Sequence, residues 1–191
     1  MSLNQNTSRL FIAIKLYPDP AFDLIVKNIR LKLREEKIRW IRRDNLHLTI
    51  RFLGETENNK LPLITEKLKE LALQTRSFPL SIKGLGVFRS FSYPKVLWAG
   101  VKNSIPLIEL NNKVDKALNS IDYQFTSDNY RPHLTLGRMR SIQNRNEFRE
   151  VVTSNEGQLF LKQDVESVVL FESILKNDGP EYFPVSEHFF L

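Results

Sequence analysis

A four-residue phrase occurs twice in this 191-residue chain: His-Leu-Thr followed by an aliphatic residue, at His47–Ile50 and again at His133–Leu136. Because the chain has only three histidines and eight threonines, background residue frequencies give two such matches odds of roughly one in several thousand. Side chains alternate faces along a strand, so each phrase would present its histidine and threonine together and turn its aliphatic residues the other way. The repeat therefore predicts two similar strands, each anchored in a core and each displaying a His-x-Thr pair.

Hydrophobic periodicity predicts more strands than helices around these phrases. Strands are expected over residues 9–16, 38–42, 46–54, 78–88, 95–101, 133–140, 164–173 and 183–191, and helices over 18–36, 59–75, 104–121 and 144–154. Ser104 is the predicted N-cap of the third helix, with Pro106 in its first turn. No Gly/Ser-rich linker divides the chain. We therefore expect an α+β fold in which residues 1–191 form one domain of two sheets or lobes, with the helices packed outside.

Composition excludes several classes of protein. The chain has no cysteine, which removes disulfides, a thiolate nucleophile and sulfur-ligated metal sites. Its first 20 residues contain no charged start followed by an apolar run and a small-residue cleavage site, and nowhere do 18 apolar residues run together. A cytoplasmic protein with no membrane span is expected.

The net charge of +6 and pI of about 9.5 favour a polyanionic partner such as RNA. Basic residues gather in segments 37–45, 87–90 and 136–141, in or beside the two phrases. Lysine and arginine are also common at solvated strand edges, where they discourage aggregation. Charge alone leaves both interpretations open.

Two imidazoles on facing walls of a cleft would suit in-line chemistry at phosphorus. A neutral histidine takes a proton from the attacking oxygen while a protonated one gives a proton to the departing oxygen, and an ordinary pKa near 6.5 allows both forms. Threonine hydroxyls can donate to the phosphate oxygens as charge develops on them. This chemistry predicts catalytic roles for His47 and His133 and phosphate-binding roles for Thr49 and Thr135.

Other catalytic chemistries lack their sequence signals. The chain has no His-x-x-x-His pair, no Asp/Glu cluster beside the histidines, no Gly-x-Ser-x-Gly and no Gly-x-x-x-x-Gly-Lys, so neither a metal nor another cofactor is expected. The third histidine, His188, lacks the threonine two residues on and is interpreted as a surface or edge residue. Trp40, Tyr93, Trp98 and Tyr130 could stack a base. Core packing is favoured for Trp98, and the other three stay open.

The two phrases and their surroundings resemble the two-histidine phosphoesterase superfamily, and the wider match is similar to its bacterial and archaeal RNA 2′,3′-cyclic phosphodiesterases, also called 2′-5′ RNA ligases. The resemblance spans most of the chain: RLFIAI, IRWIRRDNLHLTIRFLGE, LGVF, PKVLWAGV, YRPHLTLGRMR and VVLFESILKNDGPEYFPV. It implies a bilobal, pseudo-symmetric fold in which two antiparallel sheets form a central groove. It also implies metal-independent hydrolysis of RNA 2′,3′-cyclic phosphate ends to 2′-phosphomonoesters, with reverse 2′-5′ ligation.

The resemblance further implies His47 as the acid, His133 as the base, and a substrate contact from Arg138, five residues after the second histidine. Strict alternation would instead place Arg138 opposite His133, unless Gly137 marks a bulge. By the same parity Arg51 shares the face of His47 and is a rival for the phosphate contact.

Two alternatives to this function are carried forward. The fold could be a non-catalytic module that binds a nucleotide or an RNA end, or a phosphodiesterase for another cyclic phosphate or for a 2′-5′ linkage. The expected partners are RNA or oligonucleotide ends and nucleoside cyclic phosphates, bound by a monomer with no membrane contact. A turnover assay with a nucleoside 2′,3′-cyclic phosphate separates an enzyme from a binding module.

Overall fold

The computed structural model describes residues 6–125, 130–177 and 179–191. The sequence predicts no signal peptide in the first 20 residues, and residues 1–5 of that segment lie outside the described ranges. The strands are β1 (Thr7–Lys15), β2 (Lys37–Trp40), β3 (His47–Glu57), β4 (Phe78–Phe88), β5 (Val96–Val101), β6 (His133–Ser141), β7 (Leu159–Val165), β8 (Ser167–Lys176) and β9 (Gly179–Phe189). The α-helices are α1 (Pro20–Lys32), α2 (Leu61–Ala72), α3 (Ile105–Asn119) and α4 (Arg145–Ser154).

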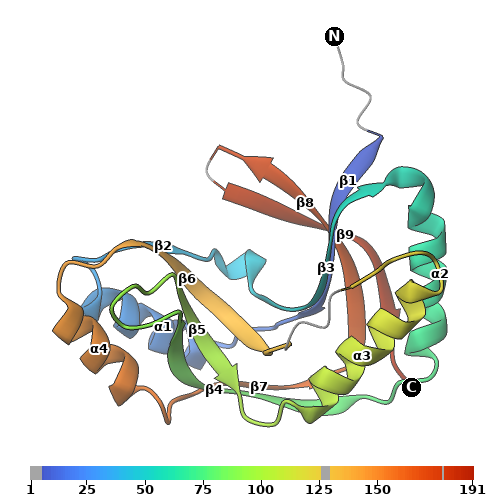
Figure 1. The fold of residues 1–191 in the computed structure, drawn as a ribbon. Coiled ribbons are helices and arrows are strands. Elements are labelled where there is room, and N and C mark those ends of the chain that lie inside the picture. Colours follow the sequence, from blue (N-terminus) through green and yellow to red (C-terminus); the bar gives the residue numbers. More distant parts are fainter. Residues whose placement is uncertain (1–5, 126–129, 178) are drawn as a thin grey trace.

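The strands form two antiparallel sheets (Figure 1). One has the order β3-β1-β8-β9 and the other β2-β6-β5-β4-β7. Helices α2 and α3 pack on the four-stranded sheet, and α1 and α4 contact β7 and β4 of the five-stranded sheet. The two His-x-Thr phrases begin β3 and β6, which belong to different sheets. The predicted α+β fold of two antiparallel sheets with outer helices is confirmed.

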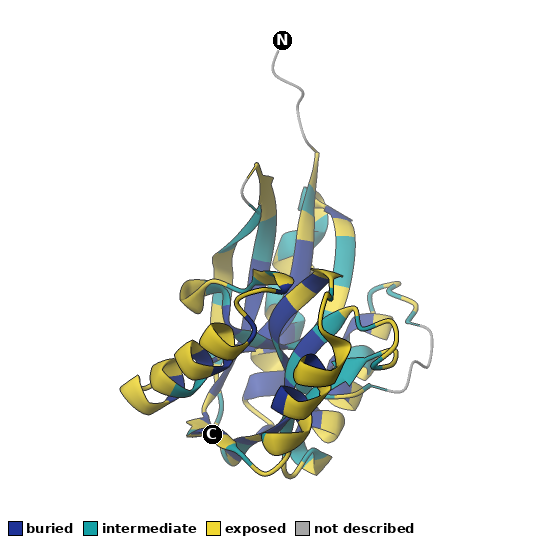
Figure 2. Ribbon diagram, turned by 90° about the vertical axis from the view of Figure 1, so that its left-hand side faces the viewer, coloured by how far each residue is buried: buried dark blue, intermediate teal, exposed yellow. Residues whose placement is uncertain are grey.

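The aliphatic residues of both phrases are buried in the hydrophobic core, as alternation predicts. Leu48 and Leu134 are 0% exposed and Ile50 and Leu136 are 2% exposed, all within one hydrophobic core that also contains the inner faces of the helices. Figure 2 shows the same division, with buried residues along the strands and exposed ones on the outer helix surfaces. Burying such a side chain stabilises the fold by about 1.5–3 kcal/mol. The core therefore fixes which face of each strand carries the histidine.

The prediction of one strand over residues 164–173 is wrong. The chain leaves one sheet and enters the other at Glu166: Val165 pairs with Phe78 in the five-stranded sheet, whereas Ser167 pairs with Phe189 in the four-stranded sheet. The Glu166 carbonyl accepts a hydrogen bond from Phe190 N at 2.7 Å. The residues before and after Glu166 are both buried. The hydrophobic pattern therefore does not show where the chain passes from one sheet to the other.

Ser104 stands at the N-cap of α3 as predicted, but its hydroxyl makes no capping hydrogen bond. Its φ of −89° and ψ of −9° are helical, whereas a capping side chain needs an extended backbone. The Ile105 N–H instead donates to Asn103 Oδ1 at 3.4 Å.

A buried carboxylate joins the end of the α1 region to the start of α4. Glu36 is 9% exposed and accepts hydrogen bonds from Gln143 N at 2.6 Å and Asn144 N at 2.9 Å. Asn144 is in turn the N-cap of α4, where its side chain accepts from Glu147 N. One carboxylate thus fixes the turn that follows β6.

Replacing Glu36 by Ala is expected to lower the free energy of unfolding by about 2–4 kcal/mol, because two partly buried N–H groups lose a charged acceptor. Urea denaturation measures the change. Glu35→Ala is the matched control: Glu35 is exposed and pairs with the neighbouring Arg34, so a change within about 0.5 kcal/mol is expected. Equal effects of the two substitutions would contradict the role given to Glu36.

Candidate active site

The two His-x-Thr pairs share one groove between the sheets. Strands β3 and β6 are in contact, and the charge of His133 acts on His47. Thr49 from the first pair and His133 from the second both line a cavity of about 540 Å³. Phe52, Phe88 and Phe125 give this cavity aromatic walls. The structure therefore brings together side chains that are 86 positions apart in the sequence.

Each histidine is held by a hydrogen bond from its Nδ1 to the backbone carbonyl two residues earlier. His47 Nδ1 lies 2.7 Å from the carbonyl oxygen of Asn45, and His133 Nδ1 lies 2.7 Å from that of Arg131. A carbonyl can only accept, so each Nδ1 carries a proton and donates. The remaining ring nitrogen, Nε2, is left for chemistry in both residues. In neutral His47 this nitrogen accepts from Thr49 Oγ1 at 3.0 Å.

His47 lies in an apolar pocket of aromatic rings. Its ring centroid is 4.9 Å from that of Phe11 and 5.1 Å from that of Tyr182, which meets it edge-on. Burial lowers the pKa of His47 to about 4; the hydrogen bond to Asn45 opposes this shift, and the charges of His133 and Arg138 add to it. His47 is therefore neutral at pH 7 in the free protein.

His133 is less enclosed than His47. The Phe88 ring meets it edge-on with centroids 4.6 Å apart. Burial lowers the pKa of His133 below its ordinary value, against the hydrogen bond to Arg131 and with a further lowering by Arg138. The groove thus favours the neutral form of both imidazoles, and the effect is stronger for His47 than for His133.

A β-bulge resolves the position of Arg138. Along β6, Thr135 pairs with Trp98 and Gly137 pairs with Leu97, so Leu136 is the extra residue. The bulge shifts the alternation, and Arg138 is exposed between buried Gly137 and Met139, on the face of His133. A side-chain carbon at Gly137 would lie 2.6 Å from Ile38 Cγ2, which explains the glycine. Arg138 acts on the pKa values of both histidines.

A second bulge breaks the strict alternation between His47 and Arg51, although Arg51 still lines the cavity with Thr49 and His133. Along β3, Thr49 pairs with Ala13 but Arg51 pairs with Ile12, whose side chain is in the core on the helix side. The Arg51 guanidinium is ion-paired with Asp115 of α3 and donates to Asn111 Oδ1 at 3.2 Å. Its charge is already used to fasten β3 to α3.

Sequence reasoning missed Phe11, Phe88 and Tyr182 as neighbours of the histidines. They lie on β1, β4 and β9, and nothing local in the sequence marks them. It also left open Tyr130, whose hydroxyl donates to the Thr49 carbonyl at 2.9 Å and so ties the segment before β6 to β3. Burial raises the pKa of Tyr130, which keeps it a donor.

The other aromatic and histidine predictions have mixed outcomes. Core packing is wrong for Trp98, which pairs with Thr135 on the groove face and lies tilted against Phe88, with ring centroids 5.5 Å apart. Tyr93 is 70% exposed. His188 lies on β9, an edge strand, with Nε2 3.0 Å from Ser186 Oγ, and its interpretation as an edge residue is confirmed.

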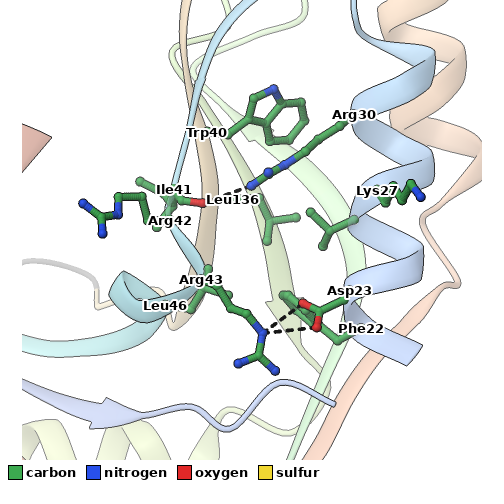
Figure 3. A pocket seen from close by; sticks show the side chains of 11 residues that line it. Phe22, Asp23, Lys27, Arg30, Trp40, Ile41, Arg42, Arg43, Leu46 and Leu136 are labelled. Carbon is green, nitrogen blue, oxygen red and sulfur yellow. Dashed lines mark hydrogen bonds and ion pairs between the residues drawn. The ribbon is translucent and has the colours of Figure 1, made fainter. Parts of the chain in front are cut away.

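A second cavity, of about 390 Å³, lies between α1 and the segment that joins β2 to β3 (Figure 3). Trp40 is in this cavity, and Arg30 packs on it with its guanidinium carbon 5.1 Å from the ring centroid. Arg30 also donates to the Ile41 carbonyl at 3.1 Å, and Arg43 pairs with Asp23 at 3.1 Å. Figure 3 shows Arg42 pointing away from α1. Neither His47 nor His133 lines this cavity, and its carboxylate, Asp23, is ion-paired with Arg43.

Within residues 6–125, 130–177 and 179–191, no group of three or more His, Asp or Glu side chains is arranged to hold a metal ion. No helix in the described part of the chain is long and apolar enough to cross a membrane.

Comparison with known proteins finds relatives that are described as RNA 2′,3′-cyclic phosphodiesterases. The chain is 33% identical over 175 residues to an RNA 2′,3′-cyclic phosphodiesterase of Archaeoglobus fulgidus, covering 91% of this chain and 96% of the relative. It is 28% identical to a protein of the same name from Methanocaldococcus jannaschii, covering 94% and 99%. The crystal structure of TT0787 of Thermus thermophilus superposes with a TM-score of 0.77 at 25% identity, covering 95% and 97%.

Residues 16–98, which include the first phrase, match the family described as LigT like Phosphoesterase. The paired His-x-Thr groove, the two-sheet fold and this similarity over nine-tenths of the chain lead to one conclusion: the chain belongs to the LigT-like phosphoesterase family.

Proposed function

We propose that this protein hydrolyses the 2′,3′-cyclic phosphate at the end of an RNA or oligonucleotide to a 2′-phosphomonoester, without a metal, and that the reverse reaction joins ends through a 2′-5′ linkage. One observation carries the proposal. Imidazoles from separate sheets each have Nδ1 fixed on a backbone carbonyl and Nε2 available to the same groove. The relatives named RNA 2′,3′-cyclic phosphodiesterase support this substrate.

The geometry suits an in-line displacement. Neutral His133 takes a proton from water as the water oxygen bonds to phosphorus, and protonated His47 gives its proton to the 3′ oxygen as the bond from phosphorus to that oxygen breaks. The products are a 2′-phosphate and a free 3′ hydroxyl. Thr49, Thr135 and Arg138 stabilise the charge on the non-bridging oxygens. Because His47 is neutral in the free protein, its acid role requires that the bound phosphate raise its pKa.

The partners are RNA ends and nucleoside cyclic phosphates, and we place the protein in the cytoplasm as a monomeric, one-domain enzyme. The basic composition and the cationic surroundings of the histidines support an anionic ligand. A non-catalytic module, or an enzyme for another cyclic phosphate or for a 2′-5′ linkage, is the alternative. Assays with each of these substrates distinguish them.

Replacing either histidine by Asn is expected to lower turnover of a nucleoside 2′,3′-cyclic phosphate by about 10²–10⁴-fold, because one proton-transfer group is lost. Asparagine has an N–H near the position of Nδ1 and can keep the bond to Asn45 or Arg131, which protects the fold. His188→Asn is the matched control and should retain full activity. Near-normal turnover in His47→Asn or His133→Asn would remove the two-histidine mechanism.

Exhaustive treatment with EDTA is expected to leave turnover unchanged, because histidines and hydroxyls supply the proton transfers and the charge stabilisation. The measurement is the initial rate before and after chelation. A rate that falls with EDTA and returns with added Mg²⁺ or Zn²⁺ would show that a metal takes part.

The pH dependence of kcat/KM follows from the lowered pKa values. The reactive form has one protonated and one neutral histidine, and the pKa of His47 is about 4 while that of His133 is below its ordinary value. The pair therefore loses its last proton below pH 6.5, and kcat/KM should fall by about tenfold or more between pH 6 and pH 8. The maximum of kcat should lie at higher pH, because the bound anion raises both pKa values. A kcat/KM maximum near pH 8 would contradict these environments.

A further inference from the structure

The end of the β8–β9 hairpin extends beyond the four-stranded sheet. In the described part of the chain, β8 pairs with β1 from Val169 to Glu172, but it continues to pair with β9 as far as Lys176 and Gly179. We call residues 173–176 and 179–182 the hairpin end. Figure 1 shows it reaching away from β1 on the side where β2 lies. Two strands without a third neighbour are marginally stable in water, so contacts with other elements decide where the hairpin end lies.

Asn45 fastens the hairpin end to the segment before β3. It closes a short 3₁₀ turn, and its Nδ2 donates to the Pro180 carbonyl at 2.8 Å. The next residue, Leu46, is 7% exposed and packs in the core, which anchors the turn. Arg39 of β2 also lies against Gly179 in the hairpin end. Because β3 and β9 are opposite edges of the four-stranded sheet, the bond from Asn45 connects these edges across β1 and β8.

The hairpin end also contacts His47 directly. Tyr182 lies two residues after Pro180 on β9, and its ring meets the His47 ring edge-on with centroids 5.1 Å apart. The Tyr182 ring is held in turn against Phe11, with centroids 4.9 Å apart. Asn45 acts from the other side, because its backbone carbonyl accepts the hydrogen bond from His47 Nδ1 at 2.7 Å. Asn45 therefore holds the imidazole with its main chain and the neighbouring strand with its side chain.

His133 is oriented by elements other than the hairpin end. The carbonyl that accepts from its Nδ1 belongs to Arg131, and the ring that meets it edge-on is Phe88 of β4. Its strand, β6, pairs with β2 and β5 in the five-stranded sheet. A movement of the hairpin end would therefore change the surroundings of His47 more than those of His133.

We propose that Asn45 is a positioning residue for His47: its bond to Pro180 latches the hairpin end beside the groove, and this latch keeps the imidazole oriented and shielded from water. The inference rests on the function proposed above, in which His47 transfers a proton. A hydrogen bond between an amide and a carbonyl contributes modestly to stability, so its loss releases the hairpin end without unfolding the protein. Misplacing a reacting group by about 1 Å can slow a reaction about 10²-fold, so a small release affects turnover.

Replacing Asn45 by Ala removes the latch and keeps the backbone carbonyl that holds His47. The pKa of each histidine is measured by NMR from the chemical shift of its ring C–H against pH, and the His→Asn variants assign the three signals. The pKa of His47 should rise toward its ordinary value by about one unit or more, because water reaches the ring. The pKa of His133 should change less, and that of His188, at the other end of β9, should stay unchanged.

This pKa change reports access of water rather than a change of charge. The titratable and charged groups around His47 are His133 and Arg138 on β6, Tyr182 on β9, and its register partner Lys15 on β1. Asn45→Ala leaves all of these groups in place and removes no charge. A purely structural role for Asn45 would lower the free energy of unfolding and leave the pKa of His47 as it is.

Two further measurements follow the latch and its effect on turnover. Hydrogen exchange at the amides of the hairpin end should be faster in Asn45→Ala, since this segment opens more often. The kcat for a nucleoside 2′,3′-cyclic phosphate should fall roughly ten- to a hundredfold, with KM changed less, because the loss concerns the orientation of a reacting group.

Asn28→Ala is the matched control, since Asn28 is exposed on α1 and the substitution removes the same atoms there. It should change neither the pKa of His47, nor the exchange rates, nor kcat. An unchanged pKa of His47 in Asn45→Ala, equal exchange of the hairpin end in the two variants, or full kcat in Asn45→Ala would overturn the positioning role. The pKa and exchange measurements need no substrate, so they test the latch even if no cyclic phosphate is hydrolysed and the proposed function fails.

Discussion

The site depends on one constraint: aliphatic side chains on β3 and β6 are buried at alternate positions. Leu48 and Ile50 fill the core between the four-stranded sheet and its helices, and this burial sends His47 and Thr49 to the other face. A slip of one residue would bury the polar pair and expose the aliphatic one, at a cost of several kcal/mol. The same few positions therefore determine both the stability of the strands and the orientation of the histidines.

The pseudo-symmetry extends to the hydrogen bonds that orient the imidazoles, but it stops at their surroundings. Each Nδ1 donates to the carbonyl two residues earlier, so the backbone of the strand itself selects the tautomer and no carboxylate is required. Phe11 and Tyr182 lie beside the ring of His47, whereas Phe88 meets the ring of His133 edge-on. The two equal sequence phrases thus place their imidazoles in unequal environments, because of residues that the phrases do not contain.

The sequence predicts those features that depend on the alternation of apolar and polar residues. It does not predict those that depend on the register between strands. Alternation in two short phrases is sufficient to predict four groove residues, because the buried leucines leave one orientation available. It is not sufficient for Arg51 and Arg138, since a bulge adds one residue to a strand without changing its hydrophobic pattern. Leu136 and Gly137 are both buried, and only the register with β5 shows that the alternation shifts there. The crossing at Glu166 is hidden for the same reason.

These bulges divide the work of two arginines that have nearly equivalent positions after their motifs. Arg51 lines the cavity beside Thr49 and pairs its charge with Asp115, which fixes β3 to α3. Arg138 turns into the groove, and within the described part of the chain the charges that act on the two histidines are cationic. Burial and these cations together hold the imidazoles neutral, and a bound phosphate opposes both effects because it supplies a negative charge beside them. Under the mechanism proposed above, the substrate itself completes the protonation state that its own hydrolysis requires.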